Sequence, residues 1–296
     1  MNSDLRLVRN KLKKVTKVNT NVDMSKNCTF GIGGKASILV EPLSVEELIK
    51  IMDIVGAYHV KYLVVGNSSN ILYNSEGYDG VVIKMTRFNR LEFHGKTIVA
   101  HAGVNLTTLI KESVNRGLKG LEDGFLIPAT VGGAVKMNAS AFDFKTENCI
   151  ESVLALVDGK IQLYTKDECK FGYRTNIFKE GDIILRVQFK LEKGVKKELK
   201  SRLEEIVELR KLKLNNTKSA GCVFKNPLGY SAGQLIEDAG LKGLTIGGAK
   251  ISTKHANIIE NINNATSEDV KALIKLVVDK IKELYNIDME MEIKNY

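Results

Sequence analysis

The sequence predicts a mixed α and β protein of the α+β class, built as two domains. Three observations lead to this prediction. Helix and strand signals alternate along the whole chain. The 296 residues suggest two domains at roughly 150 residues per domain. Apolar residues make up 44% and charged residues 27% of the chain, the balance of a globular protein with a sizeable core.

The first half of the chain predicts two capped helices and a buried strand. Ser44-Val45-Glu46-Glu47 is a capping box, which predicts a helix of about a dozen residues that ends near Gly56. The apolar run 61–65 predicts a buried strand. Asn105 caps a second helix, whose apolar residues recur at helical spacing until Gly117 ends it.

The second half predicts a hairpin and a long terminal helix. Asp158-Gly159 separates two alternating runs, 153–157 and 161–164, and this pattern is typical of a two-residue hairpin turn. A long helix is expected from Ser267 to Tyr285.

A charged amphipathic helix is expected over residues 196–213. Its apolar stripe consists of Leu199, Leu203, Ile206, Leu209 and Leu212. We expect this helix to link a first domain, residues 1–195, to a second domain, residues 196–296.

The net charge of +9 is concentrated in two segments. Residues 1–20 and 190–218 each carry a net charge of +5, so the remainder is close to neutral. A basic chain can indicate nucleic-acid binding. However, no helix-turn-helix, RNP or Cys/His finger pattern is present, and aromatic residues make up only 6%. We therefore expect no nucleic-acid partner, and expect the charge to serve solubility and the attraction of anionic small molecules.

Neither a membrane nor a metal partner is indicated. No apolar run approaches the roughly 20 residues that span a bilayer, and the N-terminal residues lack an apolar stretch of signal-peptide length, so a cytoplasmic location is expected. The four histidines are scattered, and the cysteines form no CxxC pair. These cysteines are Cys28, Cys149, Cys169 and Cys222.

Three stretches rich in Gly, Ser and Asn lie next to apolar strands, at residues 29–36, 65–71 and 127–139. Glycine lets the backbone approach a ligand closely, and successive unpaired N–H groups can donate hydrogen bonds to phosphate oxygens. Three such loops in one chain favour a large anionic cofactor with a diphosphate. None of them matches a P-loop or a GxGxxG that opens a βαβ unit.

Four further motifs follow these loops: Phe171-Gly172-Tyr173-Arg174, the stretch 220–227, the stretch 232–243 and the stretch 251–257. In order and spacing, all seven resemble those of the UDP-N-acetylenolpyruvoylglucosamine reductase (MurB) family, flavoenzymes of peptidoglycan synthesis. The resemblance covers the chain from about residue 20 to residue 294. It implies a vanillyl-alcohol-oxidase-type (PCMH) FAD-binding domain with two subdomains, followed by a smaller α/β substrate-binding domain. The short distance between Arg174 and Cys222 resembles the compact, Gram-positive style of the family.

The resemblance also implies a reaction. NADPH reduces bound FAD and leaves, and the enolpyruvyl ether of UDP-N-acetylglucosamine then takes the hydride in the same place and becomes UDP-N-acetylmuramate. The expected partners are therefore the UDP-sugar substrate and NADPH. The implied biological role is cell wall biogenesis, with its links to cell shape and cell division, and the expected state is a monomer.

Roles for individual residues follow from the same resemblance. Arg174 is expected to bind the substrate carboxylate through its bidentate fork. Cys222 is expected to protonate the enediolate-like intermediate, with Glu292 as an acid partner. The residues expected to bind the cofactor are Gly33, Gly34, Val65, Gly66, Asn67, Ser68, Ser69, Asn70, Pro128, Thr130, Val131, Gly132, Gly133, Ala134 and Asn138. The residues expected to bind the substrate are Tyr173, Arg210, Lys213, Asn226, Gln234 and Glu237.

The chain departs from the family pattern at three places. Cys222 stands where the family usually has serine, and a thiol is the stronger acid yet stays mostly protonated at neutral pH. Ala129 replaces a usual glycine, which is tolerable if residue 129 does not need a positive φ. Ser140-Ala141-Phe142-Asp143 replaces Gly-Ala-Tyr-Gly, and Asp143 places a negative charge where a glycine would leave room for the flavin.

Three other functions stay open at this point. One is an oxidoreductase of the same FAD fold with another substrate. Another is a relative without flavin that binds nucleotide-sugars or a protein partner. The last is a basic nucleic-acid-binding module, for which steep salt dependence of binding is expected.

Overall fold

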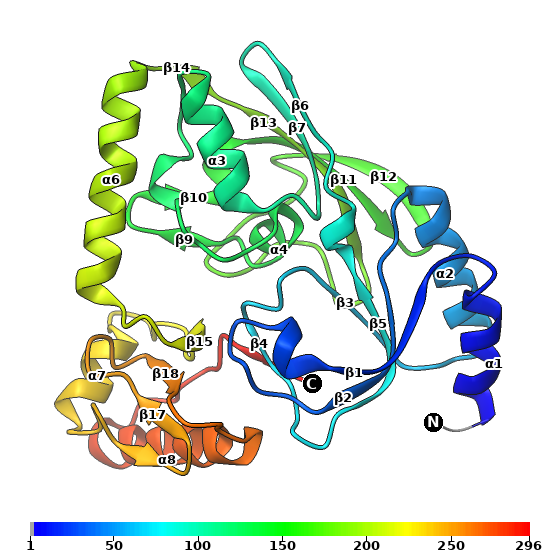
Figure 1. Cartoon of the computed structure of the whole chain (residues 1–296). Helices are drawn as coiled ribbons and strands as arrows, with labels where there is room; N and C mark the ends of the chain where they lie inside the picture. Colours follow the sequence, from blue (N-terminus) through cyan, green and yellow to red (C-terminus); the bar gives the residue numbers. More distant parts are fainter. Residues whose placement is uncertain (1–2) are drawn as a thin grey trace. The chain divides into compact units, whose positions relative to one another are not determined.

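The computed structural model describes residues 3–296, and their contacts divide the chain into two compact units (Figure 1). Unit 1 consists of residues 3–20, 38–67 and 80–208. Unit 2 consists of residues 21–37, 68–79 and 209–296. The chain therefore passes between the units several times along its length. The division into an FAD-binding domain, residues 1–195, and a substrate-binding domain, residues 196–296, stays a prediction.

Two helices pack side by side in unit 1, α1 (Ser3–Leu12) and α2 (Val45–Ala57) (Figure 1). The predicted cap of α2 is confirmed, because Ser44 Oγ accepts a hydrogen bond from the Glu47 N–H at 3.1 Å. The Glu47 carboxylate accepts from the Leu43 N–H at 2.8 Å, one residue before the position expected for a capping box.

A four-stranded sheet has the strand order β1-β2-β5-β3. Its strands are β1 (Val18–Asp23), β2 (Lys35–Val40), β5 (Tyr78–Lys84) and β3 (Tyr62–Val65). The predicted strand at 61–65 is thus confirmed as β3, which pairs in parallel with β5.

A five-stranded sheet in unit 1 has the order β12-β11-β13-β7-β6. Its strands are β6 (Leu91–His94), β7 (Thr97–His101), β11 (Ile150–Val157), β12 (Lys160–Thr165) and β13 (Ile183–Lys190). Neighbouring strands pair antiparallel throughout. The predicted hairpin between β11 and β12 is confirmed, with Asp158 at φ +49° and Gly159 at φ +73°, the conformation that a type I′ turn requires.

Short elements connect this sheet to the predicted cofactor loops. The helices are α3 (Leu106–Asn115), α4 (Val131–Lys136) and α5 (Thr146–Cys149). The paired short strands are β8 (Leu118–Lys119) with β14 (Glu192–Lys193), and β9 (Ser140–Ala141) with β10 (Phe144–Lys145). Asn105 caps α3 as predicted, and α4 packs against β13 and β7.

The charged helix predicted at 196–213 is confirmed as α6 (Lys196–Lys213). Of the residues in its predicted apolar stripe, Leu199 and Ile206 are buried, whereas Leu212 is 74% exposed. The apolar stripe is therefore not buried along the last turn of the helix.

Unit 2 contains a second four-stranded sheet, with the order β15-β18-β17-β16. Its strands are β15 (Lys218–Cys222), β16 (Thr245–Ile246), β17 (Ala249–Ile251) and β18 (Ile258–Asn261). The helices are α7 (Ala232–Asp238) and α8 (Ser267–Tyr285), and α8 packs against β16 and β17 (Figure 1). The predicted bounds of α8 are confirmed, and Thr266 and Asp269 form its capping box.

The remaining short elements complete the two units. The strands β4 (Ile71–Leu72) and β19 (Lys294–Asn295) pair in parallel within unit 2. Three 3₁₀ turns are η1 (Met24–Asn27), η2 (Met85–Arg87) and η3 (Glu122–Gly124). Within residues 3–296, no helix combines the length and the apolar character needed to cross a bilayer.

Each unit has its own hydrophobic core. In unit 1, α1 and α2 bury Leu5, Val8 and Ile51 against β5. In unit 2, α8 buries Leu273 and Val277 among the apolar residues of its sheet. The separate cores give each unit its own source of stability.

Candidate active site

The loop after β3 carries three successive backbone N–H groups that have no acceptor. The N–H groups of Asn67, Ser68 and Ser69 donate no hydrogen bond within residues 3–296. Ser68 has φ +51°, the left-handed conformation that turns neighbouring N–H groups toward a common side. Ser68 is buried, and its hydroxyl shares a 2.9 Å hydrogen bond with the Tyr73 hydroxyl. This loop therefore has the backbone arrangement that binds phosphate oxygens.

Gly66 brings this loop against the third predicted cofactor loop. A Cβ atom on residue 66 would lie 2.2 Å from Thr130 Oγ1, so only glycine allows this approach. The side-chain amide of Asn67 also donates to the Pro128 carbonyl at 3.1 Å. The structure therefore brings together these predicted cofactor residues, together with the adjacent Val65.

The start of α4 differs from the expectation of unpaired N–H groups. The N–H groups of Val131 and Gly132 donate to the carbonyls of Val104 and Ala102, both at 2.8 Å. Those of Gly133 and Ala134 donate to Thr130, which caps the helix. Because these donors are already paired, they are not available to phosphate oxygens.

Asn138 offers a buried acceptor. Its side chain is 6% exposed and donates to Glu147 Oε2 and to the Gly172 carbonyl, both at 2.8 Å. These two acceptors fix the orientation of the amide, since a flipped amide would place oxygen against oxygen. The Oδ1 atom has no hydrogen-bond partner within residues 3–296. A buried acceptor of this kind is costly unless a ligand donates to it.

Arg174 lies in a tight turn close to Asn138 in unit 1. Gly172 and Thr175 exchange backbone hydrogen bonds at 3.0 and 3.2 Å, and Arg174 between them has φ +54°. A non-glycine residue in this conformation is uncommon and is maintained by its surroundings. Tyr173 is 55% exposed, with the Arg174 guanidinium 5.8 Å from the centre of its ring.

The predicted glycines of the first loop lie in unit 2. A Cβ on Gly34 would lie 2.3 Å from the Ser75 carbonyl oxygen, and one on Gly33, at φ +145°, would lie 2.6 Å from Tyr73 Cβ. Both glycines therefore allow the 29–36 loop to pack directly on the segment that follows the 66–70 loop.

Cys222 and Glu292 are brought together in unit 2. Cys222 ends β15 directly after Gly221, whose φ is +76°, and the pairing of β15 with β18 is irregular just before it. The Val223 carbonyl, one residue further, accepts from the Glu292 N–H at 2.7 Å. Glu292 is 9% exposed, and Asn70 donates to its carbonyl at 3.0 Å. The structure thus places a half-buried thiol and a buried carboxyl group on adjacent backbone segments.

The other cysteines differ from Cys222 in their environment. Burial raises the pKa of the Cys149 thiol to about 11 and that of the Cys169 thiol to about 11. Burial also raises the pKa of Cys28. Their thiols are therefore poorer proton donors than a free thiol, and Cys149 and Cys169 are buried, whereas Cys222 is partly exposed.

Asn257 supports the backbone close to Cys222, a role that the sequence did not reveal. It is 3% exposed, accepts from the Phe224 N–H at 2.9 Å and donates to the Phe224 carbonyl at 2.8 Å. This pair of hydrogen bonds holds the segment that follows Cys222. Its place at the end of the 251–257 motif was the signal available in the sequence.

The predicted substrate residues of unit 2 are dispersed. Asn226 accepts from the Ala232 N–H at the start of α7. Gln234 and Glu237 are exposed on α7 and bond to Asp238 and Lys242, each at 2.7 Å. Lys213 is exposed at the end of α6, and burial lowers the pKa of Arg210 in the same helix.

The departures from the family pattern are accommodated. Ala129 does not adopt a positive φ, so the methyl group causes no backbone strain. Asp143 is exposed in the turn between β9 and β10.

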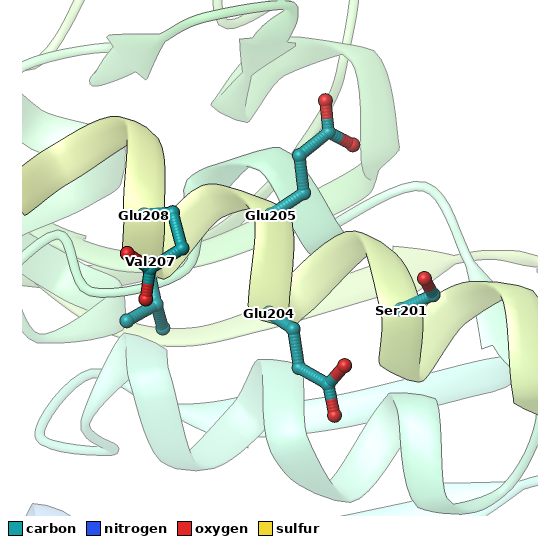
Figure 2. Close-up of a pocket in the computed structure, with 5 residues that line it drawn as sticks. All are labelled: Ser201, Glu204, Glu205, Val207 and Glu208. Atoms are coloured by element: carbon teal, nitrogen blue, oxygen red, sulfur yellow. The ribbon is translucent and has the colours of Figure 1, made fainter. Parts of the chain in front are cut away.

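A hollow of about 370 Å³ runs along α6 and contains none of the predicted site residues (Figure 2). It is lined by Ser201, Glu204, Glu205, Val207 and Glu208, and Figure 2 shows the Glu204 and Glu205 side chains pointing in different directions. Across residues 3–296, no group of three or more His, Cys, Asp or Glu side chains could hold a metal ion.

Two family models match the chain. Residues 36–163 match the model of the FAD binding domain. Residues 212–296 match the model of the UDP-N-acetylenolpyruvoylglucosamine reductase C-terminal domain.

Curated relatives match along almost the whole chain. The UDP-N-acetylenolpyruvoylglucosamine reductase of Alkaliphilus oremlandii is 37% identical over 275 residues, which cover 92% of this chain and 90% of the relative. The enzyme of the same name from Caldanaerobacter subterraneus is 38% identical over 290 residues, with 96% of each chain covered.

Solved structures agree with this match. The crystal structure of the reductase (MurB) from Thermus caldophilus has a TM-score of 0.81 and 36% identity, and covers 95% of this chain and 98% of that chain. The glucose dehydrogenase Phl p 4.0202 has a TM-score of 0.52 at 12% identity, with 64% of this chain and 44% of that chain covered, a likeness of fold alone. The predicted fold class, an FAD-binding domain of the vanillyl-alcohol-oxidase type followed by a smaller domain, is confirmed.

Proposed function

Because the chain belongs to the UDP-N-acetylenolpyruvoylglucosamine reductase family, we propose that it reduces the enolpyruvyl ether of UDP-N-acetylglucosamine to UDP-N-acetylmuramate with NADPH. The observation that carries this proposal is the likeness along both parts of the chain, the FAD-binding part and the C-terminal part specific to the reductases. The product is a precursor of peptidoglycan.

The residues present fit FAD. The unpaired N–H groups of Asn67, Ser68 and Ser69 would hold the diphosphate. Gly66 and Thr130 form a close-packed wall, and the unpaired Asn138 Oδ1 would accept a hydrogen bond from a ligand N–H or O–H group. The chemistry that FAD supplies when bound is hydride transfer between NADPH and the substrate.

Arg174 binds the carboxylate of the enolpyruvyl group in this proposal. A guanidinium offers paired N–H donors that match the two carboxylate oxygens. Hydride addition to the vinyl group moves negative charge into that carboxylate. The Arg174 charge therefore stabilises the transition state more than the ground state.

Cys222 delivers the proton that completes the reduction. The carbon next to the carboxylate becomes basic when the enediolate forms, and a thiol is acidic enough to protonate it. The 2.7 Å hydrogen bond between Val223 and Glu292 supports this assignment, because it places the Glu292 backbone beside the Cys222 segment. Glu292 acts as the acid partner of the intermediate.

Anaerobic visible spectroscopy of the FAD-loaded protein tests the proposal. NADPH should bleach the flavin band, and the enolpyruvyl nucleotide-sugar should then restore it. Bleaching without recovery would indicate an oxidoreductase with another substrate. A protein that takes up no flavin would contradict the enzyme proposal and favour a binding protein. The monomeric state, the cytoplasmic location and the lack of a nucleic-acid partner stay predictions.

A further inference from the structure

Ser140 lies in a short hairpin of unit 1, formed by β9 and β10. It pairs with Lys145 across the β9–β10 ladder. The Ala139 carbonyl beside it accepts from the Thr146 N–H at 3.0 Å and from Thr146 Oγ1 at 2.7 Å. Phe144 of the same hairpin is buried. The backbone at Ser140 is therefore held by contacts with β10 and with Thr146.

The Ser140 hydroxyl contacts Arg174. Arg174 Nη1 donates to Ser140 Oγ at 3.0 Å, and the Asn138 carbonyl lies 3.5 Å from the same nitrogen. Asn138 also holds the Arg174 turn, because its amide donates to the Gly172 carbonyl. The guanidinium and the backbone of Arg174 are thus both tied to the segment 138–140.

The chemistry of this contact suits a binding arginine. A serine hydroxyl is a neutral acceptor, so it orients the guanidinium without cancelling its charge, unlike a carboxylate partner. An arginine whose side chain is already held by this hydrogen bond binds a carboxylate ligand at a lower entropy cost.

We propose that Ser140 is a positioning residue that holds the Arg174 guanidinium in place for the carboxylate of the substrate. The inference rests on the proposed function, in which Arg174 binds that carboxylate. It goes beyond that function because it assigns a task to a side chain where the family usually has glycine.

The test compares two ligands that differ in the carboxylate. UDP-N-acetylmuramate carries a lactyl carboxylate, and UDP-N-acetylglucosamine does not. Calorimetric titration of the FAD-loaded Ser140→Ala variant should show about 5-fold weaker binding of UDP-N-acetylmuramate, because the Arg174 side chain would then be ordered only when the ligand binds. Binding of UDP-N-acetylglucosamine should be unchanged. Ser140→Thr keeps the hydroxyl and suits a strand, so it should restore the affinity.

Ser201→Ala, on the exposed face of α6, serves as the matched control and should bind both ligands normally. Equal affinities of wild type and Ser140→Ala for UDP-N-acetylmuramate would overturn the inference. Equal weakening of both ligands, or no rescue by threonine, would also overturn it. If the wild-type protein binds neither nucleotide-sugar, the proposed function itself fails. That result is distinct from failure of the inference, in which the wild type and Ser140→Ala both bind UDP-N-acetylmuramate with the same affinity.

Discussion

Gly66 lies so close to Thr130 that a Cβ atom on residue 66 would be 2.2 Å from Thr130 Oγ1. Thr130 is 2% exposed and caps α4, so its side chain cannot move away without loss of that cap. We expect Gly66→Ala to separate the two cofactor loops and to weaken FAD binding at least tenfold, about 1.4 kcal/mol or more. Titration of the flavin-free protein with FAD, followed by flavin fluorescence, measures this change.

Gly56→Ala is the control for the glycine substitution. Nothing lies within 4 Å of a Cβ at Gly56, which sits inside α2. This change should leave FAD binding intact and stabilise the protein by about 0.5–1 kcal/mol, because alanine favours the helix. If Gly66→Ala binds FAD as tightly as Gly56→Ala, the close approach does not shape the cofactor site.

The proton-donating role of Cys222 predicts a split between the two half-reactions. Cys222→Ala should slow reoxidation of the reduced enzyme by the nucleotide-sugar about 10²–10⁴-fold, the usual contribution of a positioned acid. Reduction by NADPH should keep its rate, because it needs no proton from this side chain. Stopped-flow absorbance of each half-reaction separates the two effects.

Cys28→Ser is the matched control for the cysteine variant. The Cys28 thiol donates to the Ile32 carbonyl at 3.4 Å, and a serine hydroxyl can keep that bond. Both half-reactions should proceed normally in this variant. Normal reoxidation of Cys222→Ala would rule out the thiol as the proton donor.

Asn257 should be essential for stability, because it satisfies both backbone groups of Phe224. Asn257→Ala would leave a buried N–H and a buried carbonyl without partners, at a cost of about 2–4 kcal/mol in the free energy of unfolding. Urea denaturation followed by circular dichroism measures the cost. Asn216→Ala, at an exposed position, is the control and should change stability by about 0.5 kcal/mol at most. A similarly small effect of Asn257→Ala would mean that the backbone groups find other partners.

Local signals predicted much of the fold. The caps at Ser44 and Asn105, the hairpin at Asp158-Gly159 and the bounds of α8 all follow from interactions between residues near one another in sequence. Local signals could not predict which residues belong to each unit. Unit 2 includes residues 21–37 and 68–79 because they pack on the C-terminal part, and sequence proximity carries no signal for such long-range contacts.

The candidate site also has features that the sequence predicts and features that depend on long-range contacts. The cofactor loops were recognisable because glycine, serine and asparagine cluster in them. The sequence could not show which loop keeps unpaired N–H groups. The donors of Val131 and Gly132 are taken by Val104 and Ala102, about 30 residues earlier in the chain, whereas those of Ser68 and its neighbours are not. Only the tertiary contacts determine this difference.

The environment of His255 predicts that acid weakens the fold. Burial is the main cause that lowers its pKa, and the positive charges of Lys213 and Lys242 act in the same direction. Its Nδ1 atom also has no hydrogen-bond partner within residues 3–296. At a pH between the folded and the unfolded pKa, the unfolded chain binds a proton that the folded chain does not. The contribution of His255 to stability is therefore present above its unfolded pKa, near 6.5, and is lost as the pH falls toward its lower folded pKa.

Urea denaturation at several pH values between 5 and 7.5 tests this sign. The free energy of unfolding should rise with pH across that interval in the wild type, and His255→Gln should reduce the slope because glutamine does not titrate. His94→Gln, at an exposed histidine, is the control and should leave the slope close to that of the wild type. If His255→Gln leaves the pH dependence of the free energy of unfolding unaltered, other groups cause the acid sensitivity. The His255 imidazole would then bind protons equally in the folded and the unfolded state.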